Sequence, residues 1–412
     1  MPPAAAAAEA VARRSYGKLV AFLAARTGDV AAAEDALADA FAAALVDWPA
    51  SGIPRSPEAW LLAVARRRVI DGARRRRTRA HAAEHLRLLA EEWGESMDAA
   101  AIPDDRLALM FACAHPAIDP AIRAPLMLQT ILGFDASAIA SAFLVSPATM
   151  GQRLVRAKSK IRQAGIPLRV PERAEMPERL DAVLAAIYAA FAGGWLNATR
   201  RNLAEEALWL GRLVVALLPD EPEAIGLLAL MLHAEARHAA RRDAEGTYIP
   251  LAEQDTTQWD AGLTEEAEDL LLRASALGLI GRYQLEAAVQ SAHAARRLTG
   301  QTDWTAIERL YAALSAITDS PVVAINHAVA VAEARGAEAG LACLDALATD
   351  TRLTGYQPYW AARAELLSRL GESHTADQAY QNAIGLEPDP AVRDFLLRRR
   401  QAVSRSRIPR EL

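Results

Sequence analysis

Residues 146–162 read SPATMGQRLVRAKSKIR. The pair Ser146-Pro147 is typical of a helix start, because serine caps free backbone N–H groups and proline fits the first helical position. Four apolar residues then recur at intervals of four, three and four, which places them on one side of an α-helix. They are Met150, Leu154, Ala157 and Ile161. The stretch therefore predicts a helix from Pro147 to about Arg162 with this stripe in the core.

The opposite side of the predicted helix is polar and basic. Its members are Thr149, Gln152, Arg153, Arg156 and Lys160. A shorter predicted helix, at about 137–143, precedes it across a tight turn, and this is how a helix-turn-helix presents a recognition helix to the major groove. Arginine and glutamine there pair with guanine or adenine edges. The alternative for this motif alone is an ordinary helical hairpin with a solvated face.

A second basic helix is predicted to begin at Ser56-Pro57-Glu58. Between Arg66 and Arg79 it holds eight arginines and a single acid, Asp71. Such a density of charge favours binding of a nucleic-acid backbone, and a solvated helix end is the alternative. The candidate DNA contacts are Arg66, Arg67, Arg74 and Arg75, together with Trp60, which would stack on an unpaired base. Trp60 also borders an apolar stripe (Leu61, Val64, Ala65 and Val69), so a place in the core is its alternative.

Helical periodicity extends over nearly all 412 residues, and no run of alternating Val, Ile and Thr is present, so we expect an all-α protein. The net charge of −5 is unevenly distributed. Residues 1–170 hold 22 Lys and Arg against 17 Asp and Glu, a net charge of +5, and residues 171–412 hold 24 against 34, a net charge of −10. A basic front half and an acidic back half indicate that the front binds a polyanion.

The back half contains a repeat signal. Seven residues near the C-terminus have the spacing of a tetratricopeptide (TPR) unit, in which small residues let two antiparallel helices touch. They are Trp360, Ala364, Gly371, Ala376, Tyr380, Ala383 and Pro388. Helix pairs at about 180–218, 222–242 and 264–298 are compatible with further, degenerate repeats. We therefore expect a helical solenoid in the back half.

Enzyme and membrane classes are disfavoured by what the sequence lacks. It has no G-x-G-x-x-G, P-loop, G-x-S-x-G or H-E-x-x-H motif. Cys113 and His115 are two residues apart, so they do not share a helix face, and His233 and His238 are off register for a common zinc ion. We expect no metal and no cofactor. With two cysteines, no apolar run long enough to span a membrane and no export signal, we expect a cytoplasmic protein.

Several stretches together resemble bacterial extracytoplasmic-function (ECF) sigma factors. Residues 34–41 (EDALADAF), Trp48-Pro49 and the segment 59–71 are similar to their region 2, and residues 149–158 (TMGQRLVRAK) are similar to the recognition helix of their region 4. Residues 102–107, 113–116 and 142–145, with 320–326 (SPVVAIN), are similar to the subgroup that carries a C-terminal TPR-like extension. The resemblance covers nearly the whole chain in order.

The resemblance implies a sigma factor that binds core RNA polymerase and promoter DNA. Region 2 (1–77) would dock on the clamp helices of the β′ subunit, with the β subunit as a further contact, and capture the −10 element. A connector (78–103), region 4 (104–164, −35 element), a linker (165–177) and a regulatory TPR-like domain (178–412) would follow. Asp35 and Asp39, four apart on one helix, are the candidates for the polymerase-facing side. We expect the TPR-like domain to bind a peptide or protein ligand.

Two other classes stay open at this point. One is a free-standing helix-turn-helix transcriptional regulator with a repeat-type sensor domain. It would need neither the Arg66–Arg79 helix nor a polymerase-binding face. The other is a TPR scaffold whose basic front half binds nucleic acid only loosely. Association with core polymerase distinguishes both from a sigma factor.

Overall fold

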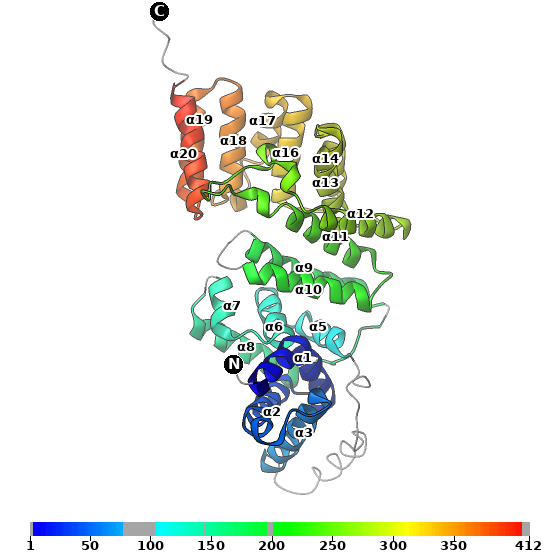
Figure 1. The fold of residues 1–412 in the computed structure, drawn as a ribbon. Helices are drawn as coiled ribbons and strands as arrows, with labels where there is room; N and C mark the ends of the chain where they lie inside the picture. The colour runs from blue at the N-terminus through cyan, green and yellow to red at the C-terminus, as the bar shows by residue number, and fades with distance from the viewer. Residues whose placement is uncertain (1–2, 77–103, 144, 173, 196–200, 406–412) are drawn as a thin grey trace, which may run out of the picture. The chain divides into compact units, whose positions relative to one another are not determined.

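The computed structural model describes residues 3–76, 104–143, 145–172, 174–195 and 201–405, and these are helical throughout (Figure 1). Within these ranges no β-strand occurs, and a single β-bridge joins Arg242 to Tyr248. The predicted all-α class is confirmed. The chain divides into two compact units, Met1–Leu210 and Gly211–Leu412. Among the described helices, none is both long and apolar enough to cross a membrane.

The first unit begins with three helices, α1 (Pro3–Thr27), α2 (Val30–Ser51) and α3 (Pro57–Arg76). Asp29 caps α2, because its carboxylate accepts a hydrogen bond from the N–H of Ala32. Helix α3 starts at Pro57, as predicted. Each of the three helices packs on the other two. The predicted connector 78–103 lies entirely outside the described residues.

Five further helices complete most of the first unit: α5 (Arg106–Cys113), α6 (Pro120–Leu132), α7 (Ala136–Ala142), α8 (Pro147–Gln163) and α9 (Met176–Trp195). Helix α1 packs directly on α5 and α6. The closest approach is at Gly17, where a Cβ atom would lie 2.1 Å from the carbonyl oxygen of Ile131. Since that oxygen belongs to the backbone of α6, only glycine fits at this crossing.

Helix α9 also packs on α5 and α6. The buried Arg179 donates a hydrogen bond to the carbonyl oxygen of Phe111 over 3.1 Å. Burial is the main reason why the pKa of Arg179 lies below its usual value. The first compact unit therefore extends past the linker expected at 165–177, and its boundary falls within α10 (Arg201–Leu217). The expected domain limits stay a prediction.

The second unit continues with helices only. Its α-helices are α11 (Pro222–Ala236), α12 (Ala261–Ala276), α13 (Arg282–Ala294), α14 (Arg296–Thr299), α15 (Trp304–Ile317), α16 (Pro321–Arg335), α17 (Ala337–Ala346), α18 (Gln357–Arg369), α19 (Ser373–Leu386) and α20 (Pro390–Arg405). Helices α16 to α20 stand side by side, each packed on the next (Figure 1). The helix pair predicted at 222–242 is wrong: this stretch forms α11 and a 3-10 turn, Ala239–Arg241. Helix α11 is buried on nearly all sides between α12 and α13, so it needs no hairpin partner of its own.

The C-terminal repeat signal corresponds to a helix pair. Ala364, Ala376, Tyr380 and Ala383 are buried in one core formed by α18, α19 and α20, and Trp360 packs at its edge. Gly371, with φ of +78°, makes the turn between α18 and α19, where a left-handed backbone favours glycine. The predicted pairing of two helices through small residues is confirmed for this unit.

Candidate nucleic-acid interface

Helix α8 is built as its sequence predicts. The Ser146 hydroxyl accepts a hydrogen bond from the N–H of Thr149 over 3.2 Å, so the helix start is capped. The predicted apolar stripe is confirmed. Its members Met150, Leu154, Ala157 and Ile161 are all buried. The five candidate DNA-reading residues (Thr149, Gln152, Arg153, Arg156 and Lys160) are all exposed. Because the buried stripe fixes the rotation of the helix, these side chains point outward together.

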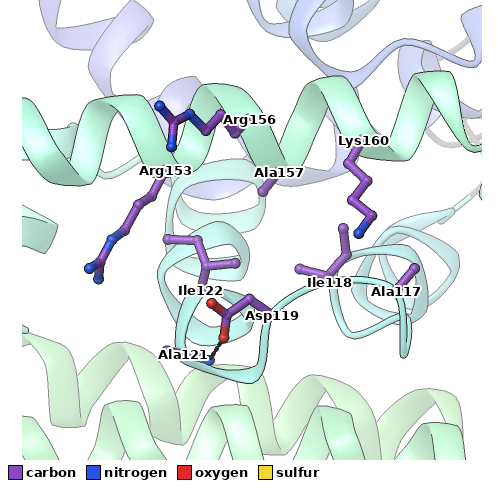
Figure 2. Close-up of a pocket in the computed structure, with 9 residues that line it drawn as sticks. All are labelled: Ala117, Ile118, Asp119, Ala121, Ile122, Arg153, Arg156, Ala157 and Lys160. Atoms are coloured by element: carbon purple, nitrogen blue, oxygen red, sulfur yellow. Dashed lines mark hydrogen bonds between the residues drawn. The ribbon is translucent and has the colours of Figure 1, made fainter.

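Three of these side chains gather at a cavity of about 380 Å³. Figure 2 shows Arg153, Arg156 and Lys160 on α8, with the ends of the two arginine side chains pointing in different directions, and Ile118 and Asp119 on the segment that leads into α6. None of the three cations forms an ion pair with a residue that the structure describes. The Asp119 carboxylate accepts a hydrogen bond from the N–H of Ala121 over 3.0 Å (Figure 2). The residues that line the cavity thus include three cations and one carboxylate, a composition that suits an anion such as a phosphate group.

The remaining cations of α8 are engaged elsewhere in the first unit. Lys158 pairs with Glu34 of α2 over 2.5 Å, and Arg162 pairs with Asp29 over 3.0 Å. Helix α8 contains no acidic residue, so its five cations depend on other segments for neutralisation. Two of them pair with the carboxylates of Glu34 in α2 and Asp29 at its N-cap, and the three at the cavity have no such partner among the described residues. The sequence motif did not distinguish these two groups of cations.

Helix α3 carries the second set of candidates. Leu61, Ala65 and Val69 are buried, which confirms most of the predicted stripe, and Val64 is half-buried. Trp60 is also half-buried, with its ring 5.6 Å from that of the buried Trp48 in an edge-to-face arrangement. Trp60 is therefore neither fully in the core nor fully open to solvent, so both alternatives for it remain.

The arginines of α3 differ in their surroundings. Arg67 is exposed, and Arg66 is half-buried. Arg68 lies 3.7 Å from Asp39 of α2, and both side chains are largely exposed, so this pair contributes little stability. Arg74 and Arg75 belong to the last turns of α3, but their side chains lie outside the described part.

A buried carboxylate orders the start of α3. Glu58 accepts hydrogen bonds from Arg14 over 2.6 Å and from Ser15 over 3.1 Å. Burial by itself would raise the pKa of Glu58, but the hydrogen bonds from these α1 side chains outweigh it and lower the pKa. The basic helix is therefore anchored to α1 by a charged group. The sequence showed Glu58 only as part of a helix start.

Helix α2 presents a mixed acidic and apolar face. Asp35 and Asp39 are exposed on it, as a polymerase-facing role would require. Leu45 is 51% exposed and Val46 is 74% exposed farther along the helix. Val46 lies seven residues after Asp39, so the two share one face. Apolar side chains left open beside carboxylates extend the candidate docking surface, and we missed them because Leu45 and Val46 fit a core stripe equally well.

The part of the chain that forms the first three helices matches a known family. Residues 11–79 match the model of sigma-70 region 2. A sigma-70 region 2 domain at this place supports a sigma factor of the sigma-70 family. Such a domain indicates a role in transcription initiation and implies binding to core RNA polymerase and promoter DNA. The matched segment holds most of α1 and all of α2 and α3, including Asp35, Asp39 and Trp60.

A second family model and one related protein also match this chain. Residues 179–275 of the chain match a family of unknown function (DUF6596). An uncharacterized protein of Rhizobium meliloti (strain 1021) is 39% identical over 365 residues, which cover 86% of this chain and 86% of that protein. No solved structure matches the chain.

Proposed function

We propose that this protein is a sigma factor of the ECF type. Its first unit reads a −10 and a −35 promoter element, and its fused C-terminal domain modulates its activity. In this proposal α2 docks on the β′ clamp helices through the face that carries Asp35 and Asp39. Helix α3 contacts the −10 element, and the α7–α8 pair is a helix-turn-helix that reads the −35 element.

The observation that carries the −35 assignment is the exposed, cationic face of α8. Arg153, Arg156 and Lys160 have no ion-pair partner among the described residues, and they line the cavity with a single carboxylate, that of Asp119. Three neighbouring cations beside one carboxylate leave an excess of positive charge. A DNA backbone supplies the missing negative charge at the cavity, while Gln152 and the arginines reach base edges. The short turn between α7 and α8 is consistent with this use.

The −10 assignment draws on α3. Its exposed Arg67 and half-buried Arg66 lie about two helical turns beyond Trp60. An aromatic ring with one open part beside basic side chains suits a single strand, since every base has a face on which to stack. Arg74 and Arg75 belong to the same proposal through their place on the helix.

The modulating role of residues 178–412 is supported by α9 and by charge. Helix α9 packs on α5 and α6, and Arg179 is hydrogen-bonded to Phe111. The DUF6596 match begins at this residue. The remaining helices carry the acidic excess of the chain, and a TPR-like array would offer a groove to a peptide or protein ligand.

Reconstituted initiation tests the proposal. The full-length protein is mixed with sigma-free core polymerase, then assayed for co-elution and for promoter-dependent transcripts. We expect Arg153→Ala to weaken binding at a good promoter by about 1–3 kcal/mol and to relax preference at one −35 position. The matched control is Arg169→Ala, since Arg169 is exposed and lies outside α8.

Each result has a clear consequence. If the protein does not bind core polymerase, the sigma-factor function is contradicted. If it binds a specific duplex without core and starts no transcription, the free-standing regulator is favoured instead. If Arg153→Ala weakens binding equally on all sequences with a shallower salt dependence, Arg153 contacts phosphate rather than a base.

Two truncations test the C-terminal domain. A chain that ends after Gly165 loses α9, whereas one that ends after Trp195 keeps α9 on α5 and α6. If the domain modulates initiation, the longer truncation changes transcript yield relative to the full chain. Identical yields from the full chain and from the longer truncation would refute modulation. A defect confined to the shorter truncation would mean that α9 only stabilises region 4.

A further inference from the structure

One segment of the second unit joins the two ends of a row of helices. Helices α13, α15, α16, α17, α18, α19 and α20 pack on one another in chain order, and α14 follows α13 at one end of the row (Figure 1). Residues 242–259 connect the 3-10 turn at Ala239–Arg241 to α12, and we call them the bridging segment. The bridging segment contacts α14 at one end of the row and α20 at the other.

The end of the bridging segment at α14 is firmly held. Arg296 of α14 donates hydrogen bonds over 3.0 to 3.1 Å to three carbonyl oxygens of the segment, those of Leu251, Ala252 and Gln254. Trp259 is only 5% exposed and packs in a small core with Ala294. Because a buried tryptophan removes a large apolar surface from water, this end belongs to the core of the unit.

The other end of the bridging segment contacts α20 through side chains. Three complementary pairs make this contact: Arg242 with Asp389, Tyr248 with Phe395, and Glu253 with Arg399. The N–O distances of the two ion pairs are 2.5 Å and 3.3 Å, and the two ring centroids lie 5.6 Å apart, edge to face. A cation, an aromatic ring and a carboxylate of the segment thus meet a carboxylate, an aromatic ring and a cation at α20.

The contact with α20 is the weaker of the two because it is open to water. The Arg242 and Asp389 side chains are 37% and 24% exposed, and those of Arg399 and Glu253 are 44% and 57% exposed. Ion pairs with this exposure contribute little stability. The bridging segment should therefore leave α20 more readily than it leaves α14.

The backbone of the bridging segment is extended at several positions. Arg242, Pro250, Gln254 and Trp259 all have extended φ and ψ values. The backbone-to-backbone hydrogen bonds of residues 242–259 stay within residues 241–259. The row of helices therefore holds the segment through side chains, as a helical array holds a separate extended peptide.

We propose that the Asp389–Arg399 side of α20 is a peptide-binding surface, occupied in this structure by residues 242–253 of the same chain. The partner is an extended peptide that carries a basic, an aromatic and an acidic residue in the order of Arg242, Tyr248 and Glu253. This inference rests on the proposed binding of a peptide or protein by the C-terminal domain, and it names the surface and the chemistry of that ligand. The partner binds by displacing the tethered residues from α20.

The tether sets the size of this competition. A segment attached by a short stretch of chain has an effective concentration of about 1 mM at its own site. For a free peptide with a Kd of about 0.1 mM for the same surface, such a competitor lowers the apparent affinity about tenfold. Loss of the three contacts between the bridging segment and α20 should remove that competition.

Fluorescence anisotropy measures the competition on the full-length chain. The probe is a fluorescein-labelled peptide with the sequence of residues 241–254. The released variant carries Arg242→Ala, Tyr248→Ala and Glu253→Ala, so it lacks the three side chains that contact α20 but keeps Trp259. We expect this variant to bind the probe about tenfold more tightly than the wild-type chain does.

A charge reversal locates the bound probe on α20. In the released variant, Arg399→Glu should weaken probe binding about fivefold, and a probe that carries Glu253→Arg should recover the lost affinity. Asp394→Asn is the matched control. Asp394 is an exposed residue of α20 that forms no ion pair with a residue that the structure describes, so this change should leave the Kd of the probe unaltered.

Hydrogen exchange tests the wild-type chain, so this measurement requires no variant to fold. A hairpin as small as Arg242–Tyr248 is not stable by itself, and its amides exchange whenever it leaves α20. We expect residues 242–249 to exchange by local opening, at least a hundredfold faster than the buried part of α11.

Three results would overturn the proposal. Equal probe affinity for the wild-type chain and the released variant would mean that the probe binds elsewhere. No binding to a released variant that keeps the helix content of the wild type would mean that α20 offers no peptide-binding surface. Exchange of residues 242–249 only through global unfolding would make the bridging segment a fixed part of the core.

The proposed function is decided by other measurements. Core binding and promoter-dependent transcription test the sigma-factor function, and the truncation after Trp195 tests modulation by the C-terminal domain. Neither measurement depends on the probe. A failure of probe binding with a changed transcript yield in the truncation would therefore overturn the peptide-binding surface alone.

Discussion

A single methyl group at Gly17 tests the packing of α1 on α6. In Gly17→Ala the new Cβ atom would lie 2.1 Å from the carbonyl oxygen of Ile131, 2.8 Å from its carbonyl carbon and 3.0 Å from its Cα atom. All three belong to the backbone of α6, so no side-chain rotation relieves the contact. One of the two helices must shift as a body.

The expected size of the effect follows from two opposing contributions. Overpacking in a close-packed interior costs about 1–3 kcal/mol, and the upper part of that range applies when backbone must move. Alanine in a helix interior gains about 1 kcal/mol over glycine. The net loss is then about 1–2 kcal/mol. In a unit of this size each kcal/mol lowers Tm by about 2–4 °C, so we expect Tm to fall by about 2–8 °C.

Calorimetry of the full-length chain measures the shift, and hydrogen exchange of the α1 and α6 peptides locates it. Gly151→Ala is the matched control: Gly151 also lies in a helix, but nothing lies within 4 Å of its added Cβ atom. That variant should be more stable than the wild type by up to about 1 kcal/mol. If Gly17→Ala were equally stabilising, the contact between α1 and α6 would be refuted.

Two further predictions concern other parts of the chain. Burial raises the pKa of the Cys113 thiol to about 12, so this thiol should not react with iodoacetamide in the native protein. Mass spectrometry should show label on the half-buried Cys343 alone in the native protein and on both cysteines in denaturant. Rapid labelling of Cys113 in the native protein would contradict its burial in α5. Burial, reinforced by the charge of Arg237, lowers the pKa of His233 to about 4. Between pH 6.5 and pH 4, His233 is therefore protonated in the unfolded chain but stays neutral in the folded chain. The second unit should therefore lose stability as pH falls from 6.5 towards 4. In urea unfolding, the free energy of unfolding of His233→Gln should depend less on pH than that of the wild type. Equal pH dependences would argue against a neutral, buried histidine.

Local patterns in the sequence were sufficient for the helices and for most of their buried sides. The stripe of α8 is a repeat of three and four residues, and any packed helix with that repeat must turn those residues inward. The cap at Ser146 and the start of α3 at Pro57 depend on neighbours within one turn. The same holds for the turn at Gly371. For these features the physical cause lies within a few residues, so one sequence determines them.

Other features required the tertiary structure because their partners are remote. Lys158 and Arg153 are both cations of one helix, but 124 residues separate Lys158 from Glu34, whereas Arg153 lies at a cavity beside Asp119. Helical periodicity indicates which residues share a face of a helix, but it does not indicate which other helix packs against that face. Val46 could equally have been a core residue, and only the packing of α2 left it exposed. The residue types on the proposed DNA-binding face were therefore determined by the sequence. The tertiary structure decided which cations of α8 pair with Glu34 and Asp29 and which line the cavity.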